Sequence, residues 1–148
     1  MTRHTVRPFE SADFDAWYPL WRGYQAFYRE DIPPDTSRET WRRLIDPAEP
    51  MWGAFACDAG RPVGIVHYLR QRTCWSVGDL CYLEDLYVDA AVRGHGVGRL
   101  LIEHVYAEAR AMGCAQVYWL THETNADAML LYDRIAVRSG FVHYRKVL

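Results

Sequence analysis

Short apolar runs separated by turn residues predict strands in the middle of the chain. Residues 52–57, 63–71 and 79–88 are β-prone, and the Asp58-Ala59-Gly60-Arg61 step between the first two is typical of a hairpin. From Val97 to Met112 the apolar residues recur every three or four positions, which is the spacing of one buried helix face. Three antiparallel strands are therefore expected to lead through a turn into an amphipathic helix.

The N-terminal third predicts a strand and two helices. A short strand at 5–8 precedes an aromatic-faced helix that starts at Ser11 or Asp13 and runs to about Tyr28. Pro19 is expected to kink or break that helix, because proline has no amide hydrogen to donate. A charged loop with two prolines at 29–35 then leads into a shorter helix that ends near residue 45.

The C-terminal third predicts a parallel strand, a helix and a last strand. Gly113 ends the central helix, and 116–121 is expected to return parallel to the preceding strand through a right-handed crossover. A helix over 125–137 and a strand over 139–144 complete the pattern. We find no repeat or linker, so the pattern predicts one α/β domain over residues 1–148 with a mixed, mostly antiparallel sheet flanked by helices.

Composition and charge argue against nucleic-acid binding, membrane association and metal binding. A net charge of −2 and a pI near 6.3 provide no basic surface for nucleic acid or an anionic membrane. No apolar run reaches a membrane-spanning length and the first residues do not resemble a signal peptide, so we expect a cytoplasmic protein. The four cysteines have no CxxC spacing. Cys74 and Cys81 flank a predicted hairpin turn and could face each other, but free thiols are expected in a reducing cytoplasm. His67, His122 and Glu123 lack ligand spacing, so no metal is expected.

The turn Arg93-Gly94-His95-Gly96-Val97-Gly98 is the strongest candidate for a binding motif. A strand, a glycine turn and a helix N-terminus together offer backbone amides and a positive dipole end to an anion such as a pyrophosphate. No Gly-Lys-Ser/Thr follows, which excludes a Walker A loop, and the glycines are spaced GxGxG where a dinucleotide fingerprint needs GxGxxG.

Three blocks in order carry a resemblance to a known family. They are the string Tyr82–Val88, the R-x-x-G-x-G motif of the glycine turn, and Asn125-x-x-Ala128-x-x-Leu131-Tyr132 followed later by Gly140-Phe141. The chain resembles the GCN5-related N-acetyltransferases, and Tyr82–Val88 is similar to the polyamine and the fungal histone and D-amino-acid branch. Gly140 follows Tyr132 by eight residues where the family usually has four, which predicts about one more turn of helix.

The resemblance implies a fold whose fourth and fifth strands are parallel and splayed, with acetyl-coenzyme A as cosubstrate. It also implies a small-molecule primary amine as acceptor and a homodimer. A catalytically silent coenzyme-binding module and a protein or peptide acetyltransferase remain as alternatives. The residues implied in coenzyme binding are Leu86, Tyr87 and Val88 through their main chain, the turn residues Arg93, Gly94, His95, Gly96, Val97, Gly98 and Arg99, and Asn125, which also caps its helix.

Acetyl transfer to an amine needs a base and an acid. Glu84 and Asp85 are adjacent, so a regular strand would point them to opposite faces and only one would meet the substrate. The resemblance selects Glu84 as base, directly or through water, with Asp85 as the alternative, and it assigns Tyr132 as general acid toward the thiolate. We expect the acceptor pocket to bind a cationic amine between aromatic walls and to draw on Tyr24, Phe27, Tyr28, Glu30 and Trp75.

Overall fold

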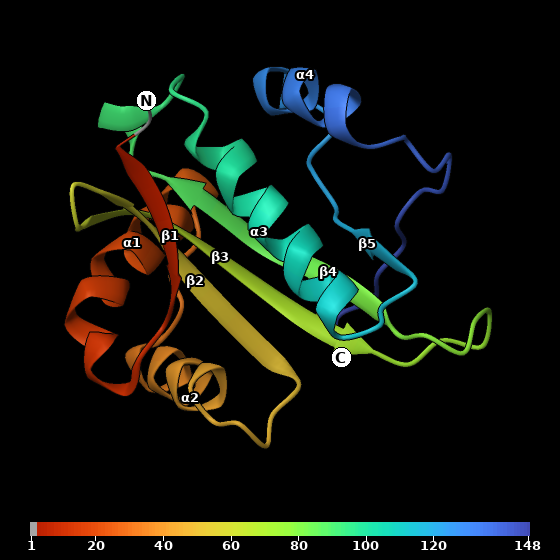
Figure 1. Cartoon of the computed structure of the whole chain (residues 1–148), viewed down its shortest axis with the longest axis horizontal. Coiled ribbons are helices and arrows are strands. Elements are labelled where there is room, and N and C mark those ends of the chain that lie inside the picture. The colour runs from red at the N-terminus through yellow and green to blue at the C-terminus, as the bar shows by residue number, and fades with distance from the viewer. Residues whose placement is uncertain (1–2) are drawn as a thin grey trace.

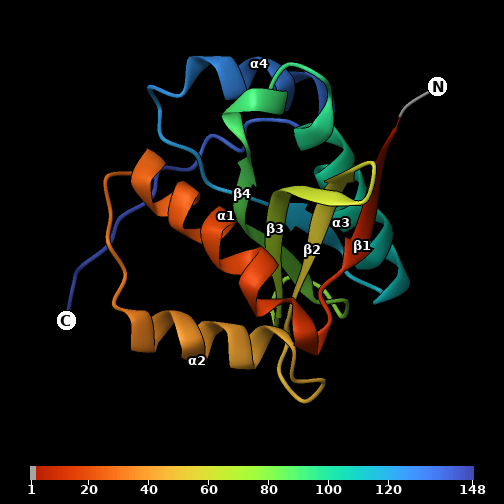
Figure 2. The ribbon, with the colours of Figure 1, turned by 90° about the vertical axis from the view of Figure 1, so that its left-hand side faces the viewer.

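The computed structural model describes residues 3–148 as one five-stranded sheet with helices on both faces (Figure 1, Figure 2). Met1 and Thr2, which belong to the predicted domain, lie outside the described residues. The strands follow one another across the sheet in chain order: β1 (His4–Pro8), β2 (Met51–Asp58), β3 (Arg61–Gln71), β4 (Leu80–Val88) and β5 (Gln116–Tyr118). Neighbours are antiparallel except β4 and β5, which are parallel, and this confirms the predicted mixed sheet.

Helices enclose the sheet from two sides (Figure 2). α1 (Phe14–Phe27) and α2 (Pro34–Leu44) cover one face, and α3 (Val97–Ala111) covers the other with help from α4 (Ala126–Ile135). Two short 3-10 turns, η1 (Ser11–Asp13) and η2 (Ala90–Val92), precede α1 and α3. Pro19 does not break α1, which continues through it as one element, because the proline removes only one hydrogen bond near the helix start.

A cluster of buried aromatic side chains lies between the sheet and the helices α1 and α2. Trp17 is fully buried and stacks on Trp21, and both pack with Trp41 against Phe55 and Ile65 of the sheet. The buried core on the α3 face is mainly aliphatic, with fully buried residues at 101, 102 and 105. The core beneath α1 and α2 is therefore richer in buried aromatic side chains than the core beneath α3.

A β-bulge at Glu84 changes which way the side chains of β4 point. His67 of β3 lies opposite Asp85 and Tyr68 lies opposite Leu83, so Glu84 has no partner. Apolar residues reach the α3 face at 81 and 83 before the bulge and at 86 and 88 after it. Glu84 and Asp85 must then both lie on the α1 face, and the expectation that they point to opposite faces is wrong.

β4 and β5 separate soon after they begin to pair. Their parallel ladder ends at Tyr82 and Tyr118, so β5 stops three residues short of the predicted 121. A bulge bends its strand and increases its twist, which accounts for β4 turning away at Glu84. From Leu83 onward the outer edge of β4 has no partner strand among residues 3–148, which matches the splayed arrangement.

The expected last strand does not form. Residues 137–148 contain neither helix nor strand, and α4 ends at Ile135 without the additional turn predicted from the spacing. Strand propensity over 139–144 is not enough, because a strand needs a paired neighbour and a packed face, while Phe141 and Tyr144 are each 90% exposed. Gly140, with φ of +85°, also interrupts the extended run.

Candidate active site

A crevice opens where β4 and β5 separate. The end of α1, the bulged part of β4, the segment after β5 and α4 all contribute to its wall. Its lining residues are Tyr24, Tyr28, Leu83, Glu84, Leu86, Trp119, Leu120, Thr121 and Tyr132. Two residues that are 48 positions apart in sequence, the predicted base Glu84 and the predicted acid Tyr132, thus line the same crevice.

Glu84 is open to solvent on one side and crowded by protein atoms on the other. Burial, and then the charge of the adjacent Asp85, raise the pKa of Glu84. A carboxyl group with a raised pKa is a stronger base once ionised than an ordinary glutamate. The bulge thus produces a pair of neighbouring carboxylates whose environments differ.

Asp85 is held by His67, whose only role considered from the sequence was that of a metal ligand. His67 is 2% exposed, and its Nδ1 lies 2.9 Å from Oδ2 of Asp85. On the other side of the ring, Nε1 of the buried Trp17 donates to Nε2 of His67, also at 2.9 Å. A chain of hydrogen bonds therefore runs from the core under α1 to the carboxylate beside Glu84.

The phenols around the crevice remain protonated at neutral pH. Burial, then the charge of Asp85, raises the pKa of Tyr24 and of Tyr28. The pKa of Tyr132 is raised by burial and then by Tyr28, and its ring packs edge-on against Trp119 with the centroids 5.3 Å apart. Tyr132 is therefore a protonated donor fixed by its aromatic neighbour, as a general acid requires.

The glycine turn ends in an uncapped helix N-terminus. Gly94 and Gly96 have φ of +83° and +78°, which is the left-handed region that favours glycine. Gly96 occupies the N-cap position of α3 without a side-chain cap, and the amide of Leu100 donates to its carbonyl. The amides of residues 97–99 come before that bond in the helix and can donate to an anion.

Two arginines flank this turn in different ways. Arg93 donates from Nε to the carbonyl of Val88, and its guanidinium lies over the rings of Phe27 and Tyr87. These contacts tie the turn to the end of β4 and to α1. Arg99 forms an exposed i,i+4 pair with Glu103, a contact of little energetic weight, and His95 is exposed.

Asn125 occupies the N-cap position of α4 without acting as a side-chain cap. Its Nδ2 donates to Oγ1 of Thr121 at 3.3 Å, and its carbonyl accepts from the amide of Met129. The expectation that its side chain caps the helix is therefore wrong. The contact with Thr121 instead joins the start of α4 to a residue that lines the crevice.

Only some of the residues expected to bind the acceptor lie at the crevice. Tyr24 and Tyr28 line the crevice, and Phe27 lies beside them under Arg93, while Glu30 is exposed in the loop that follows. Trp75 is 96% exposed in the loop before β4, whereas the crevice begins beyond Tyr82. Trp75 does not line the crevice.

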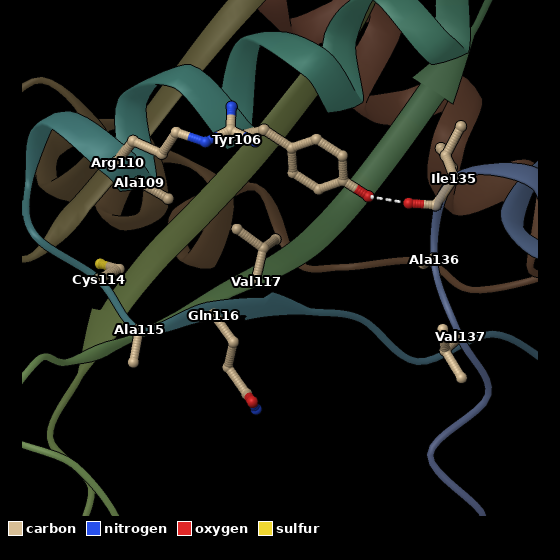
Figure 3. Close-up of a pocket in the computed structure, with 10 residues that line it drawn as sticks. All are labelled: Tyr106, Ala109, Arg110, Cys114, Ala115, Gln116, Val117, Ile135, Ala136 and Val137. Atoms are coloured by element: carbon tan, nitrogen blue, oxygen red, sulfur yellow. Dashed lines mark hydrogen bonds between the residues drawn. The ribbon is translucent and has the colours of Figure 1, made fainter.

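A larger hollow of about 360 Å³ lies away from this chemistry (Figure 3). It is bounded by the last turns of α3, by β5 and by the segment after α4, and Tyr106 donates across it to the carbonyl of Ile135. It contains no carboxylate or histidine, so the smaller crevice is the better candidate despite its size. Within residues 3–148 we find no cluster of three metal-ligating side chains and no helix long and apolar enough to cross a membrane.

Comparison with known proteins agrees with this geometry. The model of the acetyltransferase (GNAT) family matches residues 14–136. The D-amino-acid N-acetyltransferase HPA3 of Saccharomyces cerevisiae is 41% identical over 146 residues, which are 97% of this chain and 91% of that enzyme. The thialysine N-epsilon-acetyltransferase of Bos taurus is 34% identical over 76 residues, covering 51% of this chain and 44% of its own length.

Solved structures share the fold at low identity. The aminoglycoside N-acetyltransferase AAC(6')-Iy, in complex with a bisubstrate analogue, superposes with a TM-score of 0.85 at 18% identity and covers 99% of this chain and all of its own. An aminoglycoside acetyltransferase from an uncultured soil metagenomic sample superposes with a TM-score of 0.84 at 19% identity, covering 99% of this chain and 97% of its own. The chain belongs to the acetyltransferase (GNAT) family. Within that class it is an N-acetyltransferase.

Proposed function

We propose that this single-domain enzyme transfers an acetyl group from acetyl-coenzyme A to the primary amine of a small, amino-acid-like molecule. The observation that carries the proposal is that Glu84 and Tyr132 line one crevice beside the unpaired edge of β4. The free amides at the start of α3 are suited to the coenzyme pyrophosphate, and the main chain of residues 86–88 to its pantetheine arm. The acceptor class is supported by relatives that act on D-amino acids and thialysine.

The chemistry assigns one step to each group. Glu84 takes a proton from the ammonium, whose neutral form is otherwise about one part in a thousand at pH 7. The amine then attacks the thioester carbonyl, so that a C–N bond forms and the C–S bond breaks, and the nitrogen loses its second proton to solvent as the amide forms. Tyr132 gives its proton to the departing thiolate. Tyr24 and Tyr28 supply aromatic walls for a cationic amine.

Thiol release tests this function. Acetyl-coenzyme A would be offered with D-phenylalanine, D-lysine, thialysine, spermidine, sisomicin and a lysine peptide, and the free thiol would be measured. We expect the highest kcat/KM with the amino-acid-like amines. Coenzyme binding without turnover of any amine would instead favour a silent module, and turnover of the peptide alone a protein acetyltransferase.

Replacing Tyr132 by phenylalanine tests the general acid. Tyr132→Phe should lower kcat by about ten-fold or more, because the thiolate loses its proton donor, while the coenzyme Kd changes little. Tyr144→Phe is the matched control, since Tyr144 lies exposed in the C-terminal segment. Equal kcat in Tyr132→Phe and the wild-type enzyme at saturation would remove Tyr132 from the mechanism.

We also propose that the protein is a cytoplasmic homodimer. The exposed apolar side chains of the C-terminal segment, which include Phe141, Val142 and Val147, support self-association, and the four free cysteines suit a reducing compartment. Light scattering during size-exclusion chromatography should give about twice the 17.2 kDa chain mass. A mass of one chain at micromolar concentration would contradict the dimer.

A further inference from the structure

The buried ring of His67 has its two nitrogens in hydrogen bonds of known direction. The indole N–H of Trp17 can only donate, so Nε2 of His67 must be an unprotonated acceptor. A neutral imidazole carries one proton, and it must then sit on Nδ1, where it is donated to Oδ2 of Asp85. An imidazolium, or the other tautomer, would place two N–H groups 2.9 Å apart against each other.

We propose that His67, locked in this tautomer by Trp17, is a positioning residue that holds Asp85 as a fixed acceptor and so leaves Glu84 as the base. The inference rests on the proposed acetyl transfer. Oδ2 of Asp85 already accepts the His67 proton, so uptake of the substrate ammonium proton by this oxygen would compete with that hydrogen bond. Glu84 is the bulged residue beside it and has no comparable partner among the hydrogen bonds of the described residues.

The pairing gives two adjacent carboxylates different roles. Both lie on the α1 face because of the bulge, and two unheld carboxylates on adjacent residues of one face would titrate as one coupled unit. With Asp85 held, its charge faces Glu84 as a fixed neighbour, and this is one reason why the pKa of Glu84 is raised. The hydrogen-bonded chain Trp17–His67–Asp85, called the relay below, thus determines which of the two carboxyl groups gains and loses the proton during turnover.

Few other groups near the pair titrate in the working range. The ionisable side chains that face it come from α1 and its end, β3, β4 itself, β5 and α4, and they are Tyr24, Tyr28, His67, Tyr82, Tyr118 and Tyr132. Burial raises the pKa of every one of these phenols, that of Tyr82 to about 12. Below pH 9 the acid limb of activity should therefore report the carboxylates.

The tautomer can be tested without any assay of activity. Long-range ¹H–¹⁵N spectra of the uniformly labelled protein at pH 7.5 distinguish protonated from unprotonated ring nitrogens, and His67→Gln identifies the signals. We expect Nδ1 protonated and Nε2 unprotonated. A proton on Nε2 of His67 would contradict the proposed tautomer, whichever amine the enzyme acetylates.

Two substitutions then separate the two halves of the relay. The amide of His67→Asn lies near the Nδ1 position and can still donate to Asp85. The amide of His67→Gln lies near the Nε2 position, so it can accept from Trp17 but cannot donate to Asp85. Both bury a neutral amide, so both should lower the melting temperature. Circular dichroism would confirm that each variant is folded at the assay temperature.

The expected difference is in the pH profile with acetyl-coenzyme A and D-phenylalanine. His67→Asn should keep the wild-type acid limb of log kcat/KM, with a limiting slope of one. His67→Gln should lose about ten-fold in kcat/KM at pH 7, and its acid limb should differ in shape from that of His67→Asn, because Asp85 no longer accepts a proton from residue 67 and is coupled to Glu84. Profiles of one shape in both variants would mean that His67 is only structural and would overturn the proposal. Absence of wild-type turnover would instead contradict the proposed function, while the spectrum would still decide the tautomer.

Discussion

Glu84→Gln should lower kcat/KM at pH 7 by about 10²–10³-fold, the ordinary contribution of a positioned general base. The amide keeps the size of the side chain but cannot accept the ammonium proton. The coenzyme Kd should not change, because the cradle at the start of α3 does not involve this side chain. Thiol release and calorimetric titration of acetyl-coenzyme A measure the two effects separately.

Stability provides an internal check on this variant. Because the folded pKa of Glu84 is raised, the folded state binds more protons than the unfolded state, and stability falls as pH rises from the unfolded value through the folded value. At pH 7 the ionised carboxylate is therefore a destabilising group, and Glu84→Gln should melt at the same temperature as the wild-type enzyme or higher. A lower melting temperature with lost activity would point to misfolding.

The matched control is Glu49→Gln. Glu49 lies between α2 and β2, away from the crevice, and its carboxylate makes only a long contact of 3.8 Å with Arg42. This variant should have wild-type kcat/KM. If Glu84→Gln retained full activity and Asp85→Asn did not, the roles of the two carboxylates would have to be exchanged.

The bulge that pairs these carboxylates is visible in the sequence once the apolar positions are compared across it. Cys81 and Leu83 fall on odd positions, while Leu86 and Val88 fall on even ones. A regular strand keeps one parity on its buried face, so the change indicates an extra residue between 83 and 86. The assumption of regular alternation, rather than a lack of signal, produced the wrong orientation.

The role of His67 lies beyond what periodicity can predict. Its partners are 50 and 18 positions away, and only the packing of α1 on the sheet brings Trp17 over β3 next to β4. Its one local sign was a histidine within an apolar strand, which is equally consistent with an ordinary core residue. The glycine turn was more accessible to sequence analysis, since its φ angles and the helix that follows depend on nearby residues.

The prediction of a last strand over 139–144 was wrong although its local sequence pattern was sound. Pairing is a property of two segments, and β5 ends after three residues where β4 bends away. Local propensity cannot report whether a partner edge exists. The separation of β4 from β5 also creates the crevice. The geometry that leaves residues 139–144 without a partner strand is therefore the same geometry that makes room for a substrate.

Gly98→Val should raise the Kd for acetyl-coenzyme A by about ten- to a hundred-fold, as expected when one or two hydrogen bonds to a charged phosphate are lost. Gly98 is the best position for this test because its φ is not positive, unlike those of Gly94 and Gly96, so a side chain does not strain the backbone. An added Cβ would lie 3.9 Å from Leu131 and 4.0 Å from Val88, between the start of α3, the end of β4 and α4. The further methyl groups of valine would occupy the space beside the free amides.

Gly98→Ala separates bulk at this site from an effect on the helix. Its Cβ makes only ordinary contacts, and alanine favours a helix over glycine by about 1 kcal/mol, so this variant should unfold at a higher denaturant concentration than the wild-type enzyme. Its coenzyme Kd should stay within about three-fold of wild type, a difference of under 1 kcal/mol. Calorimetric titration and urea unfolding of both variants test whether the amides of residues 97–99 bind the pyrophosphate. The proposal requires both variants to be folded, with weak coenzyme binding in the valine variant and tight coenzyme binding in the alanine variant. Equal affinity in Gly98→Val and Gly98→Ala would place the pyrophosphate elsewhere.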